Sequence, residues 1–327
     1  MSIKTDLLTL FETQNELSIK EITDRLSASK QMVHIVMRQL LDNGFVEKYG
    51  RTPKTVYRFQ SKNKVEKAST PLISEKERRF LAEEFLVVTE TGKLLESIEG
   101  FDYWCKKRNL NTQKTLKEFI DTKKKQQSNY NKQGNINGFE KLKNTKGYDK
   151  IHLDYLFYLD FYAIERYGKT RLGTLLHFAK QGQNKFLMKL MMDEIRERII
   201  SFVKHSGADS IGFVPPTIRR EVQIMKFIQN NLQIPLPIIE IKKLSGIIPI
   251  PQKSLSKLDE RIVNAENTFM ISDKRTFKHI ILIDDAIGSG ATLNQIAGKI
   301  KNKKVAEKVT GLAIVGSLKG FDVLTDV

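Results

Sequence analysis

The segment from Ile280 to Ile300 constrains the fold more than any other part of the chain. Its four leading apolar residues predict a strand buried on both faces, as in a parallel sheet. Two carboxylates, Asp284 and Asp285, follow that strand. A short loop and a helix come next, because small residues precede a run of apolar residues at helical spacing from Leu293. This order is typical of an α/β domain with a mostly parallel, doubly wound sheet.

Such a strand–loop–helix junction favours an anionic ligand. Backbone N–H groups at a helix N-terminus point toward the ligand, and glycines let the backbone approach it closely. Carboxylates beside a phosphate would repel it, so Asp284 and Asp285 are expected to accept hydrogen bonds from sugar hydroxyls or to meet a metal ion. The pattern therefore indicates a sugar phosphate. The alternative is an ordinary strand–turn–helix in another doubly wound protein.

The same residues resemble the phosphoribosyl-pyrophosphate (PRPP) motif of type I phosphoribosyltransferases. The resemblance implies that Asp284 and Asp285 act in catalysis, bind the ribose hydroxyls and meet Mg²⁺ through PRPP. It also implies that the loop backbone holds the 5′-phosphate, with the residues Gly288, Ser289, Gly290, Ala291 and Thr292. The family often has threonines where this chain has Gly288 and Ser289, and only Ser289 keeps a hydroxyl.

Strand and helix patterns alternate through residues 148–327, which we expect to form the phosphoribosyltransferase-like domain. Strands are predicted at 152–164, 210–214, 236–241 and 309–315, and helices at 185–203 and 219–232. Ligands in such sheets bind beyond the carboxyl ends of the strands. In type I phosphoribosyltransferases the pyrophosphate loop follows a strand equivalent to 210–214. That resemblance adds four PRPP-binding candidates, Pro216, Thr217, Arg219 and Arg220.

Residues 251–264 resemble the mobile loop of the ComF-type branch of this family, and the likeness extends over about 155–320. It rests on Gln252, Leu255-Ser256, Arg261, Asn264 and Phe269, and on the region 167–182. The cysteine-rich finger of that branch is missing. The resemblance implies that Lys257 and Arg261 stabilise the charge of departing pyrophosphate. Lys242 and Lys243 are further candidates, and the alternative for each cation is a solvated surface charge.

Residues 1–62 are expected to form a separate module. Ser18 and Glu21 make a capping-box pattern before a helix, a short polar turn follows, and a second helix runs to Gly44. Two alternating segments, 45–50 and 55–59, predict a hairpin. This order resembles a winged helix-turn-helix domain, which would place the second helix in the major groove of DNA.

The DNA-binding candidates lie on that second helix and on the tip of the hairpin. They are Ser29, Lys30, Gln31, His34 and Arg38 on the helix, with Arg51 and Lys54 on the tip. A homodimer would suit the two half-sites that such domains commonly read. The alternatives are another nucleic acid, or a structural role in docking a protein or in dimerisation.

The middle of the chain is less informative. Residues 74–125 predict a helical region, beginning with a second capping-box pattern at Ser74 and Glu77. Phe101, Tyr103, Trp104 and Phe119 are expected to form its core, with base stacking as the alternative. Residues 126–147 are rich in Lys, Asn, Gln and Gly and predict a linker. The helical region would suit docking of a protein or ribonucleoprotein partner.

Composition excludes few functions. The net charge of +17 supports polyanion binding weakly, because the excess of Lys and Arg is spread over the whole chain. Cys105 is the only cysteine, which excludes an internal disulfide framework. The five histidines show no metal-ligand spacing. Without a signal core or a membrane-length apolar run, a cytoplasmic protein that does not enter the membrane is expected.

Three functions remain open. The first is an enzyme that transfers or cleaves a phosphoribosyl group with Mg²⁺. The second is a regulator that senses PRPP or a nucleotide without consuming it, an order of parts similar to the purine operon repressors of Gram-positive bacteria. The third is a nucleic-acid-controlled effector that acts on nucleotides, toxin-like and suited to phage defence. The acceptor, the DNA sequence and the oligomeric state are not encoded in any motif.

Overall fold

The computed structural model describes residues 3–26, 28–42, 46–50, 55–59, 73–216, 218, 220–244, 255 and 257–317. The chain divides into two compact units, residues 1–72 and 73–327. The predicted helical region and linker therefore belong to the same unit as the C-terminal α/β domain. We describe each unit by itself.

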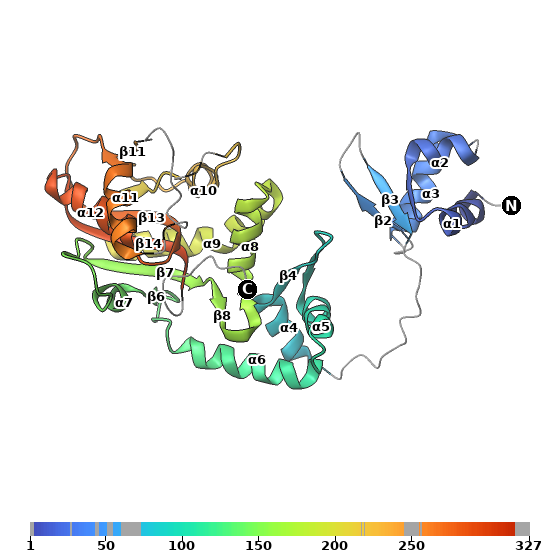
Figure 1. Cartoon of the computed structure of the whole chain (residues 1–327), viewed down its shortest axis with the longest axis horizontal. Helices are drawn as coiled ribbons and strands as arrows, with labels where there is room; N and C mark the ends of the chain where they lie inside the picture. The colour runs from blue at the N-terminus through green and yellow to red at the C-terminus, as the bar shows by residue number, and fades with distance from the viewer. Residues whose placement is uncertain are drawn as a thin grey trace. The chain divides into compact units, whose positions relative to one another are not determined.

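Unit 1 packs three helices against a small antiparallel sheet (Figure 1). Its elements are α1 (Ile3–Thr13), β1 (Glu16–Ser18), α2 (Ile19–Leu26), α3 (Lys30–Asp42), β2 (Val46–Tyr49) and β3 (Val56–Phe59). The sheet has the order β1-β3-β2, so β3 pairs with both neighbours. The predicted capping box is present: the Ser18 N–H donates to Glu21 Oε2 at 2.7 Å, and the Glu21 N–H donates to Ser18 Oγ at 3.3 Å. Leu7, Phe11 and Leu40 lie in the buried core.

Unit 2 begins with a helical region whose second predicted capping box is also present, between Ser74 and Glu77. Its elements are α4 (Glu75–Glu84), β4 (Leu86–Val88), β5 (Leu94–Glu96), α5 (Ser97–Lys107) and α6 (Thr112–Gln127). Phe101, Trp104 and Phe119 are buried, as predicted. Tyr103 instead reaches outward, and its hydroxyl donates to Glu90. The rings of Phe101, Trp104 and Phe119 belong to a core cluster that also includes residues of the α/β domain.

Residues 126–147, predicted as a linker, are an integral part of unit 2. They end α6 and form β6 (Ile136–Asn137), an antiparallel edge strand of the central sheet, and α7 (Phe139–Lys143). Ile136 and Leu142 are buried. The polar composition of this segment led to the wrong prediction of a linker. Its few apolar side chains all pack against the domain, and such tertiary packing cannot be predicted from the local sequence.

The central sheet has the strand order β10-β13-β14-β7-β6 and is parallel except for β6. Its other strands are β7 (Tyr155–Phe161), β10 (Ser210–Phe213), β13 (Phe277–Ile287) and β14 (Ala306–Gly316). The helices of this part are α8 (Arg171–Gln181), α9 (Lys185–Ser206), α10 (Ile224–Leu232), α11 (Leu258–Thr268) and α12 (Ala291–Asn302). Short pieces complete it: β8 (Ala163–Ile164), η1 (Glu165–Tyr167), β9 (Gly168–Lys169), β11 (Ile241–Lys243) and β12 (Phe269–Ile271).

Helices cover both faces of this sheet (Figure 1). Alternate side chains of β13 point to opposite faces, so each face presents apolar residues to the helices packed on it. Ile280 and Leu282 pack in one buried cluster with residues of α12. Ile281 and Ile283 pack in the other with residues of α8 and α9. The predicted mixed α/β class with a mostly parallel sheet is confirmed.

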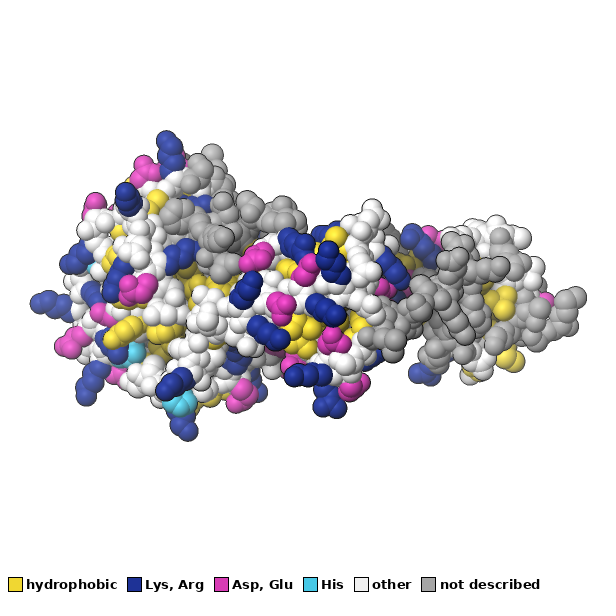
Figure 2. Space-filling view, turned by 90° about the horizontal axis from the view of Figure 1, so that it is seen from below, with side chains coloured by type: hydrophobic (Ala, Val, Ile, Leu, Met, Phe, Trp, Pro, Cys, Tyr) yellow, Lys and Arg dark blue, Asp and Glu magenta, His cyan; other side chains and the backbone are white. Residues whose placement is uncertain are grey.

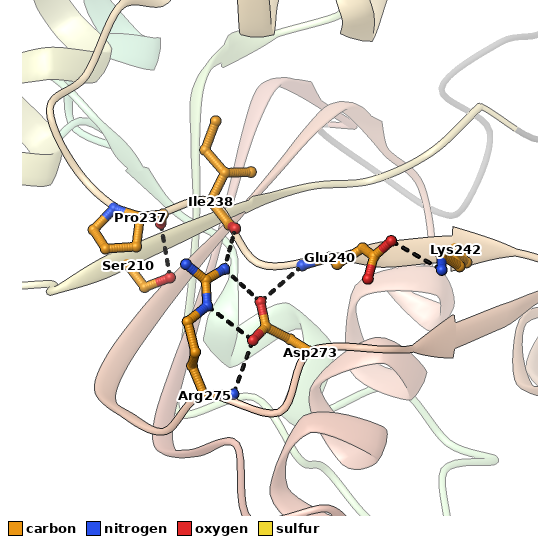
Figure 3. A network of polar contacts seen from close by, with 7 residues as sticks. All are labelled: Ser210, Pro237, Ile238, Glu240, Lys242, Asp273 and Arg275. Atoms are coloured by element: carbon orange, nitrogen blue, oxygen red, sulfur yellow. Dashed lines mark hydrogen bonds and ion pairs between the residues drawn. The ribbon is translucent and has the colours of Figure 1, made fainter.

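The strand predicted at 236–241 is wrong in extent. Only a bridge from Ile238 to Ile211 of β10 forms there, and regular pairing begins at β11, which runs antiparallel to β12. Arg275 fastens this segment: it donates to Asp273 Oδ2 at 2.6 Å and to the Ile238 carbonyl at 2.7 Å (Figure 3). Hydrogen bonds from Arg275 hold the pKa of Asp273 well below its usual range.

Arg171, at the start of α8, ties the helical region to the α/β domain. Its guanidinium pairs with Glu96 of β5 at 2.8 Å and with Glu194 of α9 at 2.7 Å. It also donates to the carbonyl of Ala82 in α4. One side chain thus joins four elements of unit 2. Among the described helices, none has the length and apolar character needed to cross a membrane.

Candidate functional site

Asp284 and Asp285 lie inside β13, just beyond the point where the neighbouring strand β10 ends. β13 pairs with β14 as far as Ile287, whereas β10 ends at Phe213, opposite Ile283. The two acidic residues are therefore the first residues of β13 beyond the end of β10. The sequence pattern predicts both residues after the strand, but the strand continues because β14 still pairs with it on the other side.

The loop after β13 leads directly into α12. Gly290, with φ 84°, is the residue before the helix, a left-handed conformation that favours glycine. Ser289 is buried, and its hydroxyl accepts a hydrogen bond from the Ala291 N–H at 3.3 Å. Ala291 and Thr292, predicted as loop residues, form the first turn of the helix. Helix N-termini present backbone N–H groups to an anion, so this geometry suits a phosphate.

Lys180, at the end of α8, completes the acidic site. Its ammonium lies 2.5 Å from Asp285 Oδ2, and the two side chains are 23% and 11% exposed. The Asp285 N–H donates to Asp284 Oδ1 at 2.8 Å. Burial, and then the charge of Asp285, raise the pKa of Asp284, while Lys180 opposes the rise. The site is thus a carboxylate pair, with Asp285 buried, Asp284 half-buried and Lys180 as a counter-ion.

No sequence pattern predicts a role for Lys180. A lysine in the last turn of an amphipathic helix is expected on electrostatic grounds alone, since it faces the negative end of the helix dipole. Its contact with Asp285 spans more than a hundred residues of sequence, so no local pattern could have revealed it.

The predicted pyrophosphate loop follows β10 and is anchored to the end of α8. Arg220 donates to Gln181 Oε1 at 3.3 Å, and the Val222 N–H donates to Gln183 Oε1 at 2.8 Å. Pro216 is half-buried. Thr217 and Arg219 lie outside the described residues. The structure therefore brings Arg220 to the residue next to Lys180, which in turn contacts Asp285.

The segment that resembles a mobile loop is partly helical, because α11 occupies 258–268. Lys257 is exposed immediately before it. Arg261 donates from Nε to the Leu255 carbonyl at 2.7 Å. Gln252 and Ser256 lie outside the described residues. Of the other cation candidates, Lys242 pairs with Glu240 at 2.9 Å (Figure 3), and Lys243 lies on the same strand.

Residues of the segment predicted as a linker, and of its continuation, line the loop between β13 and α12. The Tyr148 hydroxyl donates to the Ser289 carbonyl at 2.9 Å, and burial raises the pKa of Tyr148 to about 12, against the influence of Ser289 and Arg261. Lys141 of α7 donates to the Ser317 carbonyl at 3.1 Å and lines a small cavity together with Gly288 and Ser289. Burial lowers the pKa of Lys141. Polarity of the segment hid these contacts from sequence analysis.

The acidic pair offers few ligands for a metal ion. Across the part of the chain that the structure describes, there is no cluster of three or more His, Cys, Asp or Glu side chains suited to holding one. Two adjacent carboxylates, one of them engaged by Lys180, do not make a closed metal site. They fit a hard cation that arrives with most of its oxygen ligands supplied by water and a phosphate-bearing ligand.

In unit 1, helix α3 presents most of the predicted DNA-binding side chains to solvent. Lys30, Gln31, His34 and Arg38 are exposed. Ser29 is exposed too, but its hydroxyl accepts a hydrogen bond from the Met32 N–H, which caps the helix. Two apolar side chains share this face: Met32 is 44% exposed and Ile35 is 54% exposed. Arg51 and Lys54 lie outside the described residues.

The positive charge does not gather on the visible face of unit 2. Basic and acidic side chains are interspersed there (Figure 2), as the even spread along the sequence suggests.

Comparison of the chain with protein-family models and with curated proteins found no match.

Proposed function

We propose that the α/β part of unit 2 binds PRPP. The observation that carries this proposal is the order of groups beyond the end of β10: two carboxylates on β13, followed by a left-handed Gly290 and the N-terminus of α12. A sugar placed there would donate its hydroxyls to Asp284 and Asp285. Its 5′-phosphate would accept hydrogen bonds from N–H groups of residues 288–292. One contiguous segment would thereby recognise both ends of the ribose phosphate.

Four candidate cations, Lys180, Arg220, Lys257 and Arg261, support a phosphoribosyltransferase reaction. When a phosphoribosyl group is transferred or cleaved, pyrophosphate leaves with a large negative charge that cations must stabilise. Arg220 donates to Gln181, the residue after Lys180, and Lys257 and Arg261 lie at the start of α11. Mg²⁺ would supply further charge neutralisation when it arrives with PRPP. These residues favour catalysis over sensing alone.

The decisive experiment is calorimetric titration of the full chain with Mg²⁺ and PRPP, with pyrophosphate release followed in the same samples. The double variant Asp284→Asn/Asp285→Asn is expected to lose binding and release. A matched control, Asp121→Asn/Asp193→Asn, removes the same charge from exposed positions and should behave as the wild type. Binding without release would leave a sensor of PRPP or a nucleotide. No binding by the wild type would refute the proposal.

For unit 1 we propose DNA binding through α3. Helix α3 follows α2 after a short turn and precedes the β2–β3 hairpin, the arrangement expected of a winged helix-turn-helix domain. Its solvent face carries Lys30 and Arg38 for phosphates and Gln31 for base edges. A DNA-controlled transferase, including an effector activated by a nucleic-acid partner, would combine both units.

The DNA proposal is tested with random-sequence duplex DNA over a range of salt concentrations. Lys30→Ala/Arg38→Ala should weaken binding at least tenfold and lower the salt dependence by about two ion equivalents. Lys20→Ala/Arg25→Ala removes equal charge from exposed positions on α2 and serves as the control. Equal losses in both variants would mean binding by overall charge, and wild-type protein that ignores DNA would contradict the proposal.

A further inference from the structure

The turn between α8 and α9 holds both halves of the proposed PRPP site. Three of its side chains, within residues 180–183, reach across to other segments. Lys180 pairs with Asp285 of β13 at 2.5 Å. Gln181 accepts from Arg220 at 3.3 Å, and Gln183 accepts from the Val222 N–H at 2.8 Å, both in the segment after β10. This 180–183 turn therefore joins the sugar-binding carboxylate to the predicted pyrophosphate loop.

Backbone conformation, a helix cap and burial all constrain the 180–183 turn. Gln183 has φ 48°, a left-handed conformation that costs a non-glycine residue free energy. The next residue, Asn184, caps α9 by accepting hydrogen bonds from the N–H groups of Phe186 and Leu187. Buried Ala179 precedes Lys180 at the end of α8. Lys180 therefore projects from a capped and packed helix end, and rotation of its long side chain would let the ammonium change partner.

A diphosphate would bind Arg220 and Lys180 more strongly than their partners in this structure do. Arg220 rests on a neutral amide oxygen, at the long end of hydrogen-bond distances. Lys180 pairs with the carboxylate of Asp285. A diphosphate carries more negative charge than either partner, and charge-assisted hydrogen bonds to it are stronger than those to an amide. Sugar hydroxyls could meanwhile replace the ammonium as donors to Asp285, which keeps that carboxylate satisfied.

We propose that Lys180 is a diphosphate-binding cation that exchanges Asp285 for the diphosphate of PRPP. When PRPP binds, the ribose hydroxyls take over Asp285, and the Lys180 ammonium moves to the diphosphate beside Arg220. This inference rests on the proposed function and adds a residue to it. It also explains why Lys180 pairs with the carboxylate that the sugar must reach: the ammonium already lies close to where the diphosphate would bind.

The test compares two ligands by calorimetry, Mg²⁺–PRPP and ribose 5-phosphate, which lacks the diphosphate. Lys180→Met should weaken PRPP binding at least tenfold more than ribose 5-phosphate binding. Lys180→Arg, which keeps the charge, should retain PRPP affinity within about threefold of the wild type. Equal losses for both ligands in Lys180→Met would overturn the inference, because they would show that Lys180 merely positions Asp285.

A second pair of variants covers the case in which Lys180→Met does not fold with Asp285 left unpaired. Asp285→Asn and Lys180→Met/Asp285→Asn are titrated with Mg²⁺ and inorganic pyrophosphate, a probe that needs no sugar contact. The double variant should bind at least tenfold more weakly than the single variant, and equal affinities would overturn the inference. Wild-type protein that binds neither PRPP nor ribose 5-phosphate would instead refute the proposed function itself.

Discussion

The protonation of Asp284 affects the stability of the folded state. Burial and the adjacent Asp285 raise its pKa. A carboxyl group whose pKa is higher in the folded than in the unfolded protein destabilises the fold as the pH rises from its unfolded value of about 4 toward the raised value. Lys180 offsets part of this cost, which links the ion pair described above to stability as well as to binding.

Asp284→Asn is therefore expected to raise the melting temperature by a few degrees, and the gain should be larger at pH 8 than at pH 5. Asparagine mimics the protonated acid and still accepts the Asp285 N–H. Thermal denaturation at the two pH values measures the effect. Asp285→Asn is the counterpart: it strands Lys180 without its carboxylate and should lower the melting temperature. A gain for Asp284→Asn that is independent of pH would contradict the assigned pKa shift.

At the scale of elements, the loop before α12 depends on one glycine. Gly290 has φ 84°, and a Cβ added there would lie 3.0 Å from Leu142 Cδ1. Gly290→Ala should lower the free energy of unfolding by at least about 1–2 kcal/mol, the cost of the left-handed conformation alone. It should also weaken PRPP binding at least tenfold, because the loop backbone must shift.

Gly92→Ala is the matched control for this change. Gly92 has φ 80° in the turn between β4 and β5, with no atom within 4 Å of an added Cβ. It shares the strain without the clash and lies in a turn outside the proposed site. Urea denaturation and calorimetric titration of both variants separate the two effects. Equal affinities for PRPP in the two variants would show that the conformation of the loop does not govern binding.

Elements with strong local signals could be predicted from sequence. The capping boxes at Ser18 and Ser74 and the buried run of β13 are determined by side chains close in the chain, and the structure has them all. β1 escaped prediction because its three residues become a strand only by pairing with β3, some forty residues away. Lys141 and Lys180 escaped for the same physical reason: their contacts are made through tertiary packing.

At the scale of the whole molecule, the boundary of the C-terminal domain lies well before the predicted residue 148. Strand β6 completes the edge of the central sheet, and Trp104 and Phe119 pack against Tyr167. A fragment of residues 73–327 should unfold cooperatively on heating. A fragment of 148–327 exposes the edge of β7 and apolar surface, so it should unfold without a cooperative transition and bind a hydrophobic dye. Circular dichroism and dye fluorescence measure both fragments, and a cooperative transition of the shorter one at the same temperature would contradict this boundary.

The position of β14 within the sheet has a consequence for synthesis in the cell. β14 is the last strand described along the chain, yet it lies between β13 and β7 and pairs with both. Until the ribosome has released residues 306–316, the β6–β7 and β10–β13 halves of the sheet have no common strand. The edges of β7 and β13 that pair with β14 therefore stay unpaired in the nascent chain. A chaperone that covers strand edges would act on this protein late in translation.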